Sequence, residues 1–104
     1  HSRLMAARGI FEHELPGEAT FPQRIQGAGL RYGMIGENIY KSVNIAEPVP
    51  TAIKGWMNSP GHRKNILTPG YTETGVGVWK TGRTYYFTQD FFRPLEVRPA
   101  RPLP

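Results

Sequence analysis

Three polar side chains stand beside turn signals, where a side chain is expected to lie outside the apolar packing, and together they could do chemistry. His13 follows Phe11, Glu37 lies in a Gly-Glu-Asn-Ile segment, and His62 lies in a Ser-Pro-Gly-His-Arg segment. Two neutral imidazoles and one carboxylate could hold Zn²⁺ and leave a position for water. The same groups could instead act as acid and base without a metal. Each residue taken singly also has an ordinary structural role, so these interpretations stay open at this point.

Other common catalytic motifs are absent from the sequence. His13-Glu14 begins like the helix of HExxH metalloproteases, but Pro16 would break that helix and position 17 is glycine. No Walker-type GK[ST] segment and no G-x-S-x-G elbow is present. Cysteine is absent, which excludes disulfides, thiolate zinc sites and thiol nucleophiles. Ser59 precedes a proline, which is typical of a helix N-cap rather than of a nucleophile.

A short helix is predicted at the start of the chain. Leu4, Ala7 and Phe11 have the spacing of one helix face, and Gly9 would end or weaken that helix. The helical pattern begins at His1 without a capping residue. We therefore expect part of the first helix to lie upstream of His1.

The elements that follow are predicted from their boundary residues. Thr20 and Gln23 have the spacing of a capping box, which predicts a short helix ending at a nearby glycine. Residues 30–42 have the composition of an extended stretch or short strand. Thr51 is expected to cap a third helix, and Ser59 a fourth.

The second half of the chain contains the clearest strand pattern. Residues 68–71, Thr-Pro-Gly-Tyr, fit a type II turn. Residues 74–80 and 84–92 resemble the two strands of a hairpin. Apolar side chains occur on both faces of these strands, which is typical of a sheet covered on both sides. The predicted fold class is therefore α+β, a three-layer α-β-α sandwich with a small antiparallel sheet.

Composition limits the organisation and the partners. The 104 residues fit one domain, which we place at residues 1–93, with residues 94–104 as a proline- and arginine-rich tail or linker. No apolar run approaches the roughly 18 residues that a transmembrane helix needs. The net charge is +5, but the basic residues are scattered, so we expect no nucleic-acid site.

Several segments, in the same order along the chain, resemble one known family. They are His1-Ser2, Met5-Ala6 and Phe11-x-His13 near the start, Gly-Glu-Asn-Ile at 36–39, Trp-Met-Asn-Ser-Pro-Gly-His-Arg-Lys-Asn-Ile-Leu at 56–67, Gly-Val-Gly-Val at 75–78, and Tyr-Phe-Thr-Gln-Asp-Phe at 86–91. The sequence resembles the bacterial, cysteine-free branch of the CAP superfamily. This superfamily, also called SCP-like, includes cysteine-rich secretory proteins, antigen 5 proteins and class-one pathogenesis-related proteins.

The resemblance implies an exported α-β-α sandwich with a central cleft lined by two histidines and two acidic residues. By position in the motifs, the histidines correspond to His13 and His62, and the first acid corresponds to Glu37. In many eukaryotic members the second acid follows a helix tryptophan by three positions. Here the residue three positions after Trp56 is Ser59, so the implied set has three members.

The implied function is that of a binding module in the secreted or cell-envelope space. Asn38, Ser59 and Arg63 are expected to support the three cleft residues rather than to bind a ligand. We expect weak Zn²⁺ binding, micromolar or weaker, and a lipid, peptide or protein as the partner. Two alternatives stay open, a metal-assisted hydrolase and a structural envelope or spore-associated domain. Because the fourth cleft residue and a nucleophile are missing, we favour binding over enzymatic activity.

Overall fold

The computed structural model describes residues 1–95 of the chain. Along the sequence, the elements are α1 (Ser2–Arg8), α2 (Phe21–Gly27), β1 (Tyr32–Val43), α3 (Pro48–Met57), α4 (Pro60–Leu67), β2 (Glu73–Thr81) and β3 (Thr84–Pro94). The predicted linker at residues 94–104 begins at the end of β3, and residues 96–104 lie outside the described part.

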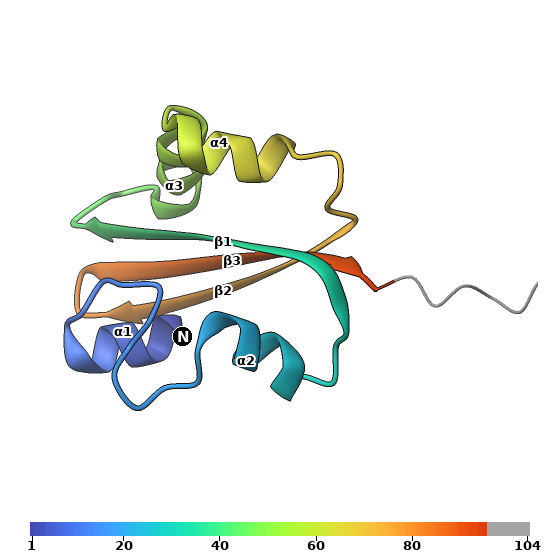
Figure 1. Cartoon of the computed structure of the whole chain (residues 1–104). Helices are drawn as coiled ribbons and strands as arrows, with labels where there is room; N and C mark the ends of the chain where they lie inside the picture. Colours follow the sequence, from blue (N-terminus) through green and yellow to red (C-terminus); the bar gives the residue numbers. More distant parts are fainter. Residues whose placement is uncertain (96–104) are drawn as a thin grey trace, which may run out of the picture.

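The elements form three layers, which confirms the predicted α+β fold. Figure 1 shows α3 and α4 above one face of the sheet and α1 and α2 below the other. The sheet is antiparallel with the strand order β1-β3-β2, so β3 is central and β1 and β2 are the two edges. None of the helices in residues 1–95 has the length and hydrophobicity of a membrane span.

The strand register decides which side chains meet on each face of the sheet. Glu37 of β1 lies opposite Asp90 of β3, and the next residue, Asn38, lies opposite Gln89. Because successive side chains of a strand point to opposite faces, Glu37 and Asp90 share the α1/α2 face. Asn38 therefore faces the layer of α3 and α4.

Two apolar clusters hold the layers together. One joins α1 to the sheet, and its buried members are Met5, Leu15, Ile39 and Tyr86. The other lies under α3, and its buried members are Ala52, Trp56 and Phe87.

The buried face of α1 differs from the predicted one. Ser2 and Met5 are buried, whereas Phe11 is 41% exposed. The helix ends at Gly9, which adopts a left-handed φ of 61°, so Phe11 lies beyond the helix and cannot share its face. The predicted end of the helix is confirmed, and the predicted apolar face is wrong.

Of two predicted helix starts, the one at Thr20 is confirmed and the one at Thr51 is wrong. Thr20 and Gln23 form the predicted capping box, with Thr20 Oγ1 accepting from the Gln23 N–H at 3.3 Å. Thr51 does not cap α3, because that helix already begins at Pro48. Proline is favoured in a first helical turn, since its missing N–H would have no helical partner there.

The turn before β2 and the coverage of β2 also correct the predictions. The Tyr71 N–H donates to the Thr68 carbonyl at 3.3 Å, but Gly70 has no positive φ, so this turn is not type II. The hairpin is confirmed, with Gly82 at φ 58° in its two-residue turn. All of β2 is exposed, however, so the sheet is not covered on both sides at this edge.

Candidate functional site

A buried carboxylate held by an arginine fork is at the centre of the candidate site. Arg24 of α2 donates from Nη1 to Oε2 of Glu37 at 2.8 Å and from Nη2 to Oε1 at 3.1 Å. The Glu37 side chain is only 2% exposed. Bidentate pairs of this kind fix both partners in position as well as neutralising the charge.

His13 joins the same carboxylate from the segment between α1 and α2. Its Nδ1 lies 3.0 Å from Oε1 of Glu37, while 51% of its side chain is exposed. Arg24 Nη2 also donates to the His13 carbonyl at 3.2 Å, which ties this segment to α2. The imidazole is therefore oriented by a buried acid and has its outer part in solvent.

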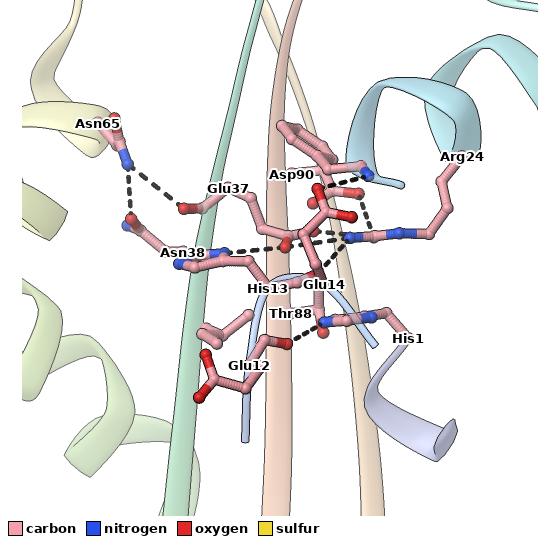
Figure 2. Close-up of polar contacts among 12 residues, drawn as sticks. His1, Glu12, His13, Glu14, Arg24, Glu37, Asn38, Asn65, Thr88 and Asp90 are labelled. Carbon is pink, nitrogen blue, oxygen red and sulfur yellow. Dashed lines mark hydrogen bonds and ion pairs between the residues drawn. The ribbon is translucent and has the colours of Figure 1, made fainter. Parts of the chain in front are cut away.

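A second carboxyl, Asp90, completes the cluster; neither it nor Arg24 was predicted as a site residue from the sequence. It is the cross-strand neighbour of Glu37, and its Oδ2 lies 3.9 Å from Arg24 Nη1 (Figure 2). The alternation of residues 84–92 suggests which of them share a face with Asp90. The pairing with β1 is set by long-range contacts, so the sequence gives no direct signal that this residue meets Glu37.

The two carboxyls differ in their protonation state at neutral pH. Burial raises the pKa of Asp90, and the hydrogen bond and negative charge of Glu37 raise it further, to about 8. Burial also acts to raise the pKa of Glu37, but hydrogen bonds from Arg24, Asp90 and His13 outweigh it and hold that pKa below its usual value. At neutral pH, Asp90 is therefore mainly a neutral hydrogen-bond donor and Glu37 a carboxylate.

The cluster keeps unused hydrogen-bonding capacity. Asp90 Oδ1 and Arg24 Nε are buried and have no hydrogen-bond partner among residues 1–95. Buried polar atoms without partners are uncommon and often mark a functional position.

His62 lies at the start of α4, in the layer on the other side of the sheet. Its Nδ1 lies 2.7 Å from Oγ of Ser59. Ser59 has the predicted N-cap position, but its hydroxyl contacts this imidazole instead of capping the backbone. The Asn38 side chain donates to the His62 carbonyl at 3.1 Å and accepts from Asn65 at 2.9 Å, and Arg63 is exposed on α4.

The predicted zinc ligands are thus only partly brought together. His13 contacts Glu37, but Arg24 takes both oxygens of that carboxylate, and the His62 imidazole has Ser59 as its partner. In the described part of the chain, no group of three or more His, Cys, Asp or Glu side chains is arranged to hold a metal ion. The described residues thus contain no preassembled zinc centre, and weak zinc binding stays a prediction.

A groove of about 540 Å³ opens beside the cluster on the α1/α2 face. Arg24 and Asp90 line one part of it, and Arg3 and Trp79 line another. Along its floor β2 contributes glycines, so the strand backbone itself is accessible from the groove. The polar cluster can therefore contact a molecule that lies along β2.

Comparisons with known proteins agree with this architecture. The family model described as CAP, cysteine-rich secretory protein family, matches residues 1–91. The chain is 39% identical over 90 residues to the uncharacterized protein YkwD of Bacillus subtilis, covering 86% of this chain and 33% of that protein. It is 34% identical over 93 residues to the uncharacterized membrane protein YlbC of the same organism, covering 89% and 25%. The chain thus spans a third or less of these relatives.

Two solved structures share the fold. One is an extracellular protein containing an SCP domain from Bacillus anthracis, with a TM-score of 0.75 and 36% identity, covering 89% of this chain and 29% of that one. The other is an outer surface protein of Borrelia burgdorferi, with a TM-score of 0.76, 19% identity and coverage of 89% and 67%. At that identity the second match supports the fold alone.

Proposed function

Because the chain belongs to the CAP family of cysteine-rich secretory proteins, we propose that it is the ligand-binding domain of an exported protein. The ligand would contact the cluster of Arg24, Glu37 and Asp90 from the adjoining groove. The description of the Bacillus anthracis relative as extracellular supports export.

The observation that carries this proposal is that one arginine serves two carboxyls. The fork of Arg24 is committed to Glu37, and the same guanidinium lies at the longer distance of 3.9 Å from Oδ2 of Asp90. The Asp90 side chain is 28% exposed and lines the groove. It can therefore hydrogen-bond a polar group of a ligand, while the Arg24–Glu37 pair holds the surrounding backbone in place.

Hydrolysis is a second candidate because of the contact between His13 and Glu37. An exposed imidazole oriented by a buried acid is the usual arrangement of a general base. Against hydrolysis, the described residues offer no metal-ligand group to activate water, and the sequence contains no recognisable nucleophile motif. Binding needs neither of these and accounts for Asp90 as well.

A single experiment separates binding, hydrolysis and a purely structural role. The ¹⁵N-labelled chain is mixed with a pool of random octapeptides, amide shifts are recorded, and the peptides are then examined by mass spectrometry. We expect shifts at Asp90, Thr88 and Gly75 with intact peptides, and loss of those shifts in Asp90→Asn. Cleavage that is abolished by His13→Ala would support hydrolysis, and unchanged spectra would support a structural role.

A further inference from the structure

The two edge strands of the sheet differ in the hydrogen bonding of their outward backbone groups. At β1, three side chains donate to backbone carbonyls that point away from β3. They are Tyr71 to the Ile35 carbonyl at 3.1 Å, Asn65 to that of Glu37 at 3.5 Å, and Trp56 to that of Ile39 at 3.0 Å. At β2, no side chain of residues 1–95 bonds the outward backbone groups of Val76 or Val78. Three outward carbonyls of the β1 edge are therefore occupied, whereas the outward groups of Val76 and Val78 at the β2 edge are not bonded by side chains of the described residues.

The register identifies the backbone groups that are available at β2. Thr81 pairs with Thr84 across a two-residue turn, so this pair exchanges hydrogen bonds and the pattern then alternates. Residues 75, 77 and 79 consequently bond to β3, whereas Thr74, Val76, Val78 and Lys80 present their N–H and C=O groups outward. The pairing of β2 with β3 has no bulge, and β2 contains no proline, so two of the usual protections of an edge strand are missing, and its charged residues lie toward its two ends, at Glu73 and Lys80.

A charged anchor lies beside this edge in the groove on the α1/α2 face. The Arg3 guanidinium lies 5.4 Å from the centre of the Trp79 ring, and both residues are exposed. Among the described residues, Arg3 has no ion-pair partner. Stacking on an aromatic ring positions an arginine to bind a carboxylate through two parallel hydrogen bonds.

We propose that the open edge of β2 binds an extended peptide as an additional strand, with an acidic side chain of that peptide on Arg3. Alternate side chains of the peptide would enter the groove over Gly75 and Gly77. The proposal rests on the proposed function, because it names the ligand of the same groove. Strand addition of this kind obtains affinity from backbone hydrogen bonds and specificity from alternate side chains.

Peptide backbone chemistry gives a direct test. The probe is a labelled octapeptide of alternating threonine and valine with one glutamate in a valine position, and binding is followed by fluorescence anisotropy. A series of peptides is methylated at one amide nitrogen each. Because only every second amide of an added strand faces β2, we expect methylation to abolish binding with a period of two residues.

Amide exchange in the protein gives the matching readout. We expect the peptide to slow exchange at Val76 and Val78, whose N–H groups face outward, and to leave Gly77, which already bonds to β3, unchanged. Arg3→Gln, or lysine in place of the peptide glutamate, should weaken binding and raise the dissociation constant of the peptide about tenfold.

A variant that fills the groove tests the position without disturbing the fold. A Cβ added at Gly77 meets nothing within 4 Å, so Gly77→Val should fold and should block the peptide. Gly61→Ala on α4 is the control, because a Cβ added there also meets nothing within 4 Å and the residue lies in the layer away from the groove. We expect this control to bind like the original chain.

Three outcomes would overturn the inference. The first is methylation effects without the two-residue period. The second is protection of Val76 and Val78 that grows with protein concentration in the absence of peptide, which would mean that a second copy occupies the edge. The third is shifts at Asp90 with no protection at β2, in which case the proposed function stands and this assignment of its ligand fails.

Discussion

Glu37 and Asp90 face each other across the β1–β3 ladder, and Arg24 beside them is bound to Glu37 through both oxygens. Burial, together with the hydrogen bond and charge of Glu37, raises the pKa of Asp90 to about 8, whereas hydrogen bonds from Arg24, Asp90 and His13 hold the pKa of Glu37 below its usual value. The predictions that follow begin with this pair.

Replacing Asp90 with asparagine should change how stability depends on pH. The pKa of Asp90 is raised from 3.8 to about 8 in the folded chain, so between these values the folded state binds more protons than the unfolded state. The free energy of unfolding should therefore fall as the pH rises from about 4 to about 8. Asp90→Asn should remove this decline and be more stable than the original chain above pH 8 by on the order of 1 to 3 kcal/mol.

Urea unfolding at a series of pH values measures this effect. The lowered pKa of Glu37 acts in the opposite direction, with stability that is lost as the pH falls below the usual range of that carboxyl. Parallel pH profiles for the original chain and Asp90→Asn would contradict the assignment.

Removing the arginine fork should strongly destabilise the fold. Arg24→Ala leaves the Glu37 charge buried without its partner, which we expect to lower the free energy of unfolding by about 3 to 5 kcal/mol. The double variant Arg24→Ala, Glu37→Gln removes the orphaned charge and should recover much of that loss. If the two single effects simply add in the double variant, the pair does not act as a unit.

Zinc binding should be weak and should increase when Arg24 is removed. With the fork in place, neither Glu37 oxygen is available beside His13, so we expect calorimetry to give micromolar or weaker affinity. Arg24→Gln frees that carboxylate and should strengthen binding, whereas Arg24→Lys keeps a charge there and should not. A loss of binding in both His13→Ala and His62→Ala would instead support the histidine pair predicted from the sequence.

Alanine substitution at two helical glycines should change the stability of the fold in opposite directions. A Cβ added at Gly55 of α3 would lie 2.6 Å from the Tyr40 ring, whereas one added at Gly61 of α4 meets nothing within 4 Å. We expect Gly55→Ala to destabilise the chain by about 1 to 3 kcal/mol through overpacking. Gly61→Ala should stabilise it by up to about 1 kcal/mol. Thermal unfolding of both variants measures the difference, and a stabilising Gly55→Ala would show that Tyr40 moves aside freely.

Local signals were sufficient for the element order, and long-range pairing decided the site. The capping box at Thr20 and the turn at Gly82 involve near neighbours, and both are confirmed. The meeting of Glu37 with Arg24 and Asp90 depends on strand register and on the packing of α2, neither of which a local pattern contains. The error at Thr51 has a local cause, since proline placed earlier in the segment starts the helix sooner.

Of the three residues that the family motifs indicated, His13 and Glu37 lie in contact, with His13 Nδ1 3.0 Å from Glu37 Oε1. The same motifs could not show that the Glu37 carboxylate is occupied by Arg24, because that arginine belongs to a separate helix. Whether His62 acts with these two residues in binding stays a prediction, and the zinc titration above tests it.

The side chains that donate to the outward carbonyls of β1 also limit how these molecules can associate. Trp56, Asn65 and Tyr71 occupy the carbonyls that an incoming strand would need there. Fibre growth by strand pairing requires two unpaired edge strands per molecule, one on each side of the sheet. Because those three carbonyls of β1 are occupied, strand pairing between molecules cannot propagate through both edges, so the fold resists polymerisation while β2 remains available to a peptide.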